Sequence, residues 1–257
     1  MRKYKGQDVL AGALAFLLAA SLAGCCKNGN DQDHSLSLLS GVLGTGNIEP
    51  PVGLASAGGF RVLAGSTVAN TGPTSVDGDL GVSPGAACTA FPAPCTGGGP
   101  GTLTGTIHAG DATAATAQSS LTTAYNDAAG RAPGTSVSGN IGGLTLAPGV
   151  YTSTSSLAIS SGDLTLTGLG NANAVFIFQI PSSLTVTTGR RVILAGRAQA
   201  SNVFWQVGSS ATLGTNSFFV GDIMALASIT LQTGASLQGR ALARTGAVTL
   251  DSAVIFP

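Results

Sequence analysis

The sequence predicts a mainly β protein whose short strands stack into a solenoid, with one α-helix. Three observations support this fold class. A triplet of the form apolar–threonine–apolar recurs through the second half of the chain at intervals of about 20 residues, a period typical of solenoids. Short β-branched runs alternate with many of the 38 glycines. One alanine-rich stretch, residues 111–129, interrupts these runs and is the single convincing helix.

The composition narrows the class of function before any motif is considered. Charged residues make up 9% of the 257 residues, and 11 basic side chains balance 11 acidic ones. Nucleic-acid binding requires a basic field, which this chain lacks. Hydrophobic residues make up 44% of the chain, so it should fold rather than remain disordered.

The N-terminus carries an export signal. Arg2, Lys3 and Lys5 precede an apolar segment at 9–22 that is too short to span a bilayer comfortably. The segment ends in Leu-Ala-Gly-Cys25, which resembles the lipobox of bacterial lipoproteins, whose cysteine is acylated. We therefore expect a signal peptide at 1–24 and a lipid anchor on Cys25, which holds the protein to a membrane surface. Cys26 rather than aspartate follows, which favours the outer membrane; an ordinary signal peptide is the alternative.

The mature chain divides into two parts. Residues 25–56 are polar and irregular and are expected to form a tether, and residues 57–257 form the folded domain. Six residues separate Cys88 from Cys95 in an exported chain, so a small loop disulfide is expected. A zinc site is not expected, because the chain has only two histidines and no second cysteine pair.

The expected helix has start and stop signals. Asp111 can cap its N-terminus, Leu121 and Tyr125 lie four residues apart on one face, and Gly130 suits its end.

The repeated triplet defines the rest of the domain. Because strand side chains alternate, the apolar residues should point inward and the threonines outward, forming a ladder with a spacing of about 4.8 Å. One longer loop is expected near residues 189–200. A β-sandwich is the alternative, but sandwich strands do not repeat one triplet at a near-constant interval. The ladder comprises Thr145, Thr165, Thr185, Thr212, Thr230 and Thr249.

No residue pattern indicates catalysis, and we expect neither an enzyme nor a bound cofactor or metal. His108 lies at the entrance of the expected helix, where hydrogen bonding explains it. Asp77 and Asp79 can form a turn or, less readily, bind calcium. Trp205 can stack on a sugar but fits a buried strand better. A hydrolase on a β-helix scaffold would require aspartates that converge in a groove.

At this point the chain resembles a known family, the bacterial and fungal ice-binding proteins. The resemblance covers about four-fifths of the chain, from residue 57 to 257. It implies an irregular, right-handed β-helix of triangular section with one long helix along a side. It also implies an ice crystal surface as the partner, and we expect a monomer. The segments that carry the resemblance are 60–68, 78–85, 174–180, 202–215 and 239–250.

The resemblance suggests which residues contact ice. The family's contact motif is loosely Thr-Gly/Ala-X-Thr/Asn, which 71–74 matches fully and 233–236 matches except for a final serine. Arg190, Arg191 and Phe218 interrupt the motif in neighbouring repeats. The threonine ladder is the competing surface. The candidate residues are Thr71, Thr74, Thr188, Thr215, Ser217, Thr230, Thr233, Ser236, Thr249, Asp251 and Ser252.

The sequence therefore predicts a non-enzymatic ice-binding protein at the cell surface, which inhibits crystal growth or recrystallisation or attaches the cell to ice. The alternative is an adhesin or structural envelope module that binds polysaccharide or protein through the same scaffold. An exposed row of aromatic side chains would favour the carbohydrate-binding alternative, and a flat threonine and serine face would favour ice.

Overall fold

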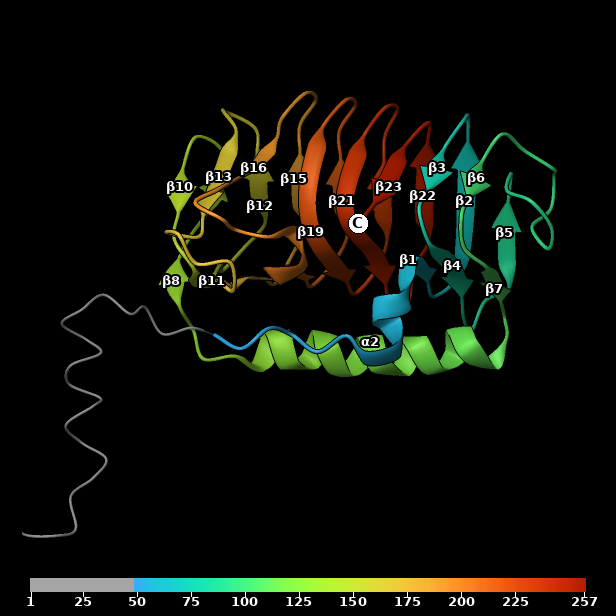
Figure 1. The fold of residues 1–257 in the computed structure, drawn as a ribbon, viewed down its shortest axis with the longest axis horizontal. Helices are drawn as coiled ribbons and strands as arrows, with labels where there is room; N and C mark the ends of the chain where they lie inside the picture. Colours follow the sequence, from blue (N-terminus) through green and yellow to red (C-terminus); the bar gives the residue numbers. More distant parts are fainter. Residues whose placement is uncertain (1–48) are drawn as a thin grey trace, which may run out of the picture. The chain divides into compact units, whose positions relative to one another are not determined.

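The computed structural model describes residues 49–257, which form three β-sheets and one long helix (Figure 1). Every strand pairing is parallel. Sheet A contains β1 (Phe60–Ala64), β3 (Ser75–Val76), β4 (Asp79–Val82), β6 (Thr102–Leu103), β7 (Ile107–Ala109), β8 (Thr135–Ser136), β11 (Gly149–Thr152), β14 (Phe176–Ile180), β17 (Val203–Val207), β19 (Phe218–Ala225), β21 (Ser236–Ala243) and β23 (Val254–Phe256).

The other two sheets are smaller. Sheet B contains β2 (Thr67–Thr71), β5 (Ala87–Thr89), β9 (Gly139–Asn140), β12 (Leu157–Ile159), β15 (Leu184–Val186), β18 (Ala211–Leu213), β20 (Ile229–Leu231) and β22 (Val248–Asp251). Sheet C contains β10 (Thr145–Leu146), β13 (Leu164–Thr167) and β16 (Val192–Ala195). From β9 to β17 the chain visits sheets B, C and A in turn, whereas before β9 and after β17 its strands belong to sheets A and B alone. We call each circuit of either kind a coil.

The order of the coils in space differs from their order in sequence. β2 pairs with β22 near the C-terminus, and β1 pairs with β21, so the N-terminal coils stack on the C-terminal ones. The helix α2 (Ala112–Gly130) then joins β7 to β8, strands at opposite ends of sheet A. Its 19 residues extend about 28 Å. It lies along one side of the stacked strands (Figure 1).

The predicted helix is confirmed in its existence and its bounds. The Asp111 side chain accepts a hydrogen bond from the backbone N–H of Ala114 at 2.8 Å. This bond, together with the hydrogen bond to His108, lowers the pKa of Asp111 below its usual value. The buried helix face, which includes Leu121 and Tyr125, packs on outward apolar side chains of sheet A such as Ile177. Within residues 49–257, no helix is both long and apolar enough to cross a bilayer.

The folded part begins earlier than the sequence indicates. Residues 49–56 were expected to belong to the tether, but Val52 is buried and Glu49 forms an ion pair with Arg131 at 3.3 Å. A short 3₁₀ helix, η1 (Ala55–Gly59), contacts α2 through a hydrogen bond between Ser56 and Ser120. A second, η2 (Ala200–Asn202), precedes β17. The remaining tether, the signal peptide and Cys25 lie outside the described residues.

An aromatic column lies within the largely aliphatic interior. The rings of Phe178 and Trp205 stack with centroids 3.8 Å apart, and Tyr151 and Phe219 extend the column on either side. The Trp205 indole N–H donates to the carbonyl oxygen of Val220 at 3.0 Å. Such pairs contribute about 0.5–1.5 kcal/mol each beyond their burial. Trp205 is therefore a core residue, as its sequence context indicated, and is not available to stack on a sugar.

One buried ion pair holds the N-terminal segment to sheet A. Asp222 on β19 is opposite Arg240 on β21, and one guanidinium nitrogen of Arg240 lies 3.0 Å from each carboxylate oxygen. Another nitrogen of Arg240 donates to the carbonyl oxygen of Gly58 in η1 at 3.0 Å. Burial raises the pKa of Asp222 to about 6, against the opposing effect of Arg240.

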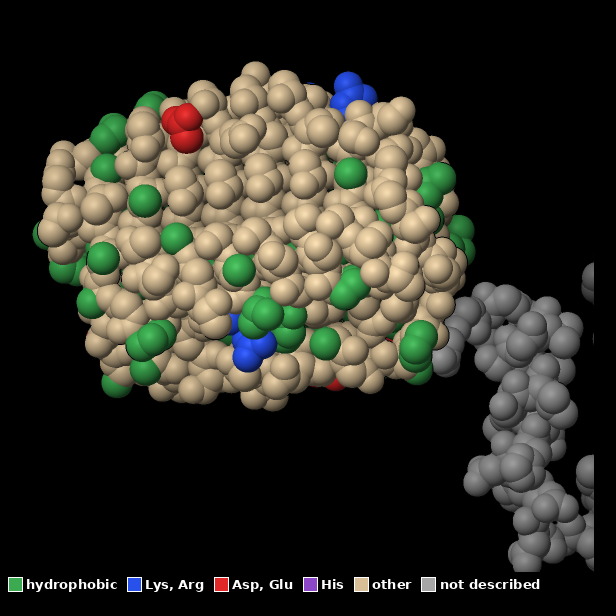
Figure 2. Space-filling view, turned by 180° about the vertical axis from the view of Figure 1, so that it is seen from behind, with side chains coloured by type: hydrophobic (Ala, Val, Ile, Leu, Met, Phe, Trp, Pro, Cys, Tyr) green, Lys and Arg blue, Asp and Glu red, His purple; other side chains and the backbone are tan. Residues whose placement is uncertain are grey.

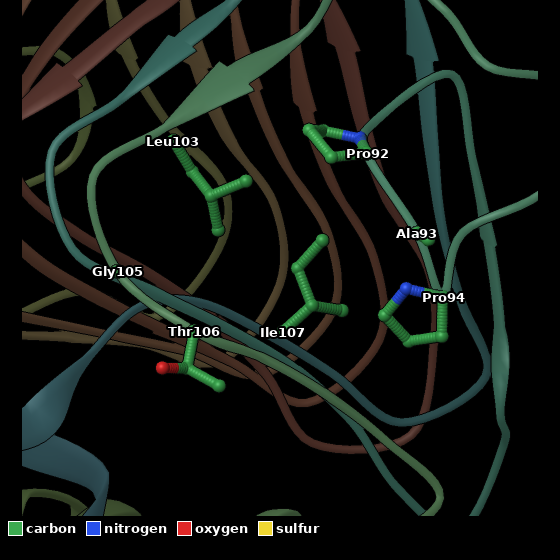
Figure 3. Close-up of a pocket in the computed structure, with 7 residues that line it drawn as sticks. All are labelled: Pro92, Ala93, Pro94, Leu103, Gly105, Thr106 and Ile107. Atoms are coloured by element: carbon green, nitrogen blue, oxygen red, sulfur yellow. The ribbon is translucent and has the colours of Figure 1, made fainter.

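The end of the stack near β5 is closed by a loop that contains a disulfide between Cys88 and Cys95. Beside it lies a pocket of about 370 Å³. Figure 3 shows Pro92 and Pro94 on one side of the pocket and Leu103 and Ile107 on the other. None of the side chains that line this pocket is ionisable or nucleophilic apart from the Thr106 hydroxyl, so nothing in it indicates catalysis.

Candidate functional site

The outer face of sheet B carries a row of threonines in register. Thr185, Thr212, Thr230 and Thr249 are direct neighbours on β15, β18, β20 and β22. The residues on either side of each threonine are buried at 1% exposure or less. The threonines therefore point outward at the spacing of adjacent strands, about 4.8 Å. The row continues to Ala158 at one end and to Ala69 and Thr89 at the other.

The predicted six-membered ladder is wrong at its N-terminal end. Thr145 and Thr165 pair with each other on sheet C, where the next residue in register is Ile193. The triplet alone does not distinguish the two sheets. Leu164 and Leu166, on either side of Thr165, are as fully buried as the residues that flank the sheet B threonines, and only Leu144 is exposed. The first two steps of the repeat are both 20 residues long. The first connects two positions on sheet C, however, and the second leads from sheet C to sheet B.

A second row of hydroxyls runs beside the threonines. Ser156, Ser183, Ser210 and Ser228 each lie two residues before a position of the first row. Along the row, the hydroxyl oxygens of Ser156 and Ser183 lie 2.9 Å apart, and the N–H of Ser228 donates to the hydroxyl of Ser210 at 3.3 Å. Sequence analysis missed this row, although the recurring Ser-x-Thr pattern at 183–185, 210–212 and 228–230 could have revealed it.

The two rows form a surface without charge. None of the eight side chains of Thr185, Thr212, Thr230, Thr249 and the four serines is ionisable. Figure 2, which views the molecule from behind, shows a broad area of backbone and of side chains that are neither hydrophobic nor charged, with few charged side chains among them. The large hydrophobic side chains that are exposed among residues 49–257 are all aliphatic, and none lies on a strand of sheet B. No exposed aromatic row is therefore present in the described part of the chain.

The Thr-Gly-x-Thr pattern lies at the corner where the chain leaves sheet B. The second residue of each such turn has a positive φ: +80° at Gly72, +71° at Gly189 and +72° at Gly234. Asn216 and Ser252 adopt the same conformation in their coils. A left-handed residue is required at this position of each of these coils, which explains the glycines on structural grounds alone.

The candidate residues fall into three groups. Thr230 and Thr249 belong to the threonine row of sheet B. Six lie at the adjoining corner and are at least partly exposed: Thr71, Thr188, Thr215, Thr233, Asp251 and Ser252. The last three, Thr74, Ser217 and Ser236, do not face this surface.

Burial and strand position explain the third group. Thr74 is 1% exposed, and its hydroxyl accepts a hydrogen bond from the N–H of Ala253 at 3.1 Å. Ser217 is 1% exposed. Ser236 begins β21 of sheet A. The motif includes these three positions. The turn, however, places its last residues inside the fold or on another sheet, so their side chains do not face this surface.

The polar residues considered for catalysis or metal binding have structural partners. The Nδ1 atom of His108 is 2.7 Å from the Asp111 carboxylate at the start of α2. Asp77 accepts from the hydroxyl of Thr104, and Asp79 accepts from the N–H of Thr106, both at 2.7 Å. Within residues 49–257, no three His, Cys, Asp or Glu side chains form a group that could hold a metal ion.

These features define a class of protein in which stacked parallel strands present rows of threonine and serine hydroxyls without charge. The chain belongs to the Ice-binding-like family, whose model matches residues 62–256. An ice-binding protein of Nostoc sp. (strain HG1) is 49% identical over 77% of this chain and 71% of its own length. One from Flavobacterium frigoris (strain PS1) is 38% identical over 78% of this chain and 74% of its own.

Solved structures show the same relationship. The crystal structure of an ice-binding protein from an Antarctic biological consortium has a TM-score of 0.77 and 53% identity, and the match covers 82% of this chain and 93% of that one. The ice-binding protein of the ascomycete Antarctomyces psychrotrophicus has a TM-score of 0.72 and 38% identity, with 80% and 98% covered.

Proposed function

We propose that this protein adsorbs to ice through the outer face of sheet B, which is formed by the threonine and serine rows, and catalyses no reaction. The observation that carries the proposal is the register of Thr185, Thr212, Thr230 and Thr249 on four adjacent strands beside the four serines. We also propose that the coils form a right-handed β-helix of triangular section. The parallel pairing and the repeated B–C–A circuit support it.

The mechanism follows from a rigid array of short side chains. Hydroxyl and methyl groups at the spacing of a strand ladder order nearby water into positions close to those of an ice plane. Molecules adsorbed in this way pin the growing crystal surface. The affinity comes from the area of the face and from its rigidity, because a preorganised surface loses little conformational entropy on binding.

We further propose that the protein acts from the cell envelope. The lipobox-like Leu-Ala-Gly-Cys25 supports a lipid anchor, most consistent with the outer membrane. A surface-anchored molecule would either inhibit recrystallisation next to the cell or attach the cell to ice. The alternative of a polysaccharide-binding adhesin receives no support from sheet B, whose described strands expose no aromatic side chain.

The test compares two tyrosine substitutions in similar local sequences. Thr212→Tyr places a ring on the proposed surface, and Thr165→Tyr places the same ring on sheet C. Each threonine lies between two buried apolar residues of its strand, and its own side chain points outward. Because a protruding ring holds the flat face away from ice, we expect Thr212→Tyr to lose most of its thermal hysteresis and ice shaping.

The matched variant decides between the faces. Thr165→Tyr should retain the activity of the unaltered protein, with both variants folded by circular dichroism. If Thr165→Tyr loses activity and Thr212→Tyr retains it, sheet C is the binding face. If the folded protein with its own sequence neither shapes ice nor lowers its freezing point, the proposed function is wrong.

A further inference from the structure

An acidic residue occupies the edge of the proposed ice-binding surface. Asp251 is the last residue of β22 and lies in register with Thr71 on β2. The threonine and serine rows carry no charge, but here the sequence places a carboxylate at a corner position that is threonine in neighbouring coils, such as Thr71 and Thr233. None of the ion pairs among residues 49–257 involves Asp251, so its charge has no cationic side chain as a partner there.

Both oxygens of this carboxylate are instead engaged by hydroxyl groups of the same surface. The Thr233 hydroxyl, from the neighbouring coil, donates to Oδ2 of Asp251. The Ser252 hydroxyl donates to Oδ1 at 3.1 Å. Hydrogen bonds from neutral hydroxyls to an ionised carboxylate are stronger than those between two neutral groups.

The backbone around this cluster leaves little room for rearrangement. Ser252 has a φ of +48°, and Gly72 of the next coil has a φ of +80°. A Cβ atom at Gly72 would lie 2.3 Å from the Ser252 hydroxyl and 3.3 Å from Oδ1 of Asp251. The next coil therefore packs directly against the hydroxyl and the carboxylate.

We infer that Asp251 is a positioning residue of the ice-binding surface, which fixes the rotamer of the exposed Thr233. The hydroxyl and the γ-methyl of threonine are both bonded to Cβ, so a hydrogen bond that holds the hydroxyl also fixes the methyl. The carboxylate thereby orders a threonine that lies at the corner, between the end of β20 and the start of β21, and therefore outside the paired strands. This inference rests on the proposed function, because it assigns Asp251 a role in that same surface.

The effect of Asp251→Ala on thermal hysteresis distinguishes the inference from its opposite. If Asp251 were only a charge on the surface, Asp251→Ala would leave thermal hysteresis unchanged or raise it. If it positions Thr233, the same variant should lose roughly half or more of its activity, because a freely rotating threonine has to be ordered on binding. Asp251→Asn keeps one acceptor oxygen and should retain more activity than Asp251→Ala.

Two further measurements identify Thr233 as the residue through which Asp251 acts. Thr233→Val removes the hydroxyl, so adding Asp251→Ala to it should cause no further loss. NMR couplings across the Thr233 Cα–Cβ bond should report one rotamer in the unaltered protein and averaging in Asp251→Ala. Additive losses, unchanged couplings, or unchanged or higher activity in Asp251→Ala would each overturn the inference.

The chain offers a matched control on another sheet. Thr104 donates to Asp77 across two neighbouring coils at the end of β3 and β6, on sheet A. Asp77→Ala and Thr104→Val remove the same kind of bond and should leave thermal hysteresis unchanged. If the unaltered protein shows no ice activity, the proposed function fails, whereas the Thr233 couplings still test the positioning by Asp251.

Discussion

The aromatic column should determine the stability of the coils that carry the threonine row. Trp205 has no exposed surface. Its ring centroid lies 3.8 Å from that of Phe178, on which it stacks, and 4.8 Å from that of Phe219. Trp205→Ala removes the indole and leaves a cavity between β14 and β19, which costs about 3–5 kcal/mol of unfolding free energy. For a domain of this size, that corresponds to a lower melting temperature by roughly 6–20 °C.

The assay is thermal and urea unfolding followed by circular dichroism. Trp205→Phe keeps a ring in the column but removes the N–H donor to Val220, so its loss should be smaller, about 1–2 kcal/mol. Val254→Ala, at a side chain 42% exposed, should cost less than about 1 kcal/mol. If Trp205→Ala cost no more than Val254→Ala, the aromatic column would not be a main source of stability.

Two other perturbations test the ion pair that holds the N-terminal segment to sheet A and the disulfide in the loop near β5. Burial raises the pKa of Asp222 from 3.8 to about 6, so its contribution to stability is fully present below pH 4 and declines as the pH rises through 6. Arg240→Met leaves that carboxyl without its partner, so urea unfolding should show a loss of about 3–5 kcal/mol near pH 8 and a smaller loss near pH 4; a loss independent of pH would contradict this. Replacing Cys88 and Cys95 with serine opens the end loop and should cost about 2 kcal/mol in the same assay, and an unchanged midpoint would show that the loop is held by other contacts.

The sequence determines the class of fold because its signals are local. The helix has a capping aspartate, an apolar face and a terminal glycine, so Asp111 and Gly130 predict its bounds closely. The apolar–threonine–apolar triplets predict strands whose flanking side chains are buried. The circuit through three sheets is not local, and Thr165 and Thr185 lie on different faces although their triplets look alike.

The site was predictable only in part for the same reason. Thr230 and Thr249 follow from the alternation of side chains on a strand. Thr74 and Ser217 were predicted to contact ice from the spacing of the turn motif. The backbone at the corner instead directs both side chains into the interior. The serine row depends on pairing between coils, which places its four members 27, 27, 18 and 19 residues before the next position along the sheet. Such unequal spacing hides a row that is regular in space.

The central claim is that the outer face of sheet B binds ice, and the most direct test is adsorption to a single ice crystal. Every lysine lies at or before residue 27, so an amine-reactive fluorophore leaves sheet B unmodified. The labelled protein should accumulate on defined planes of a growing ice hemisphere, Thr165→Tyr should do the same, and Thr212→Tyr should be excluded. Equal accumulation of both variants, or none by the unaltered protein, would contradict the account.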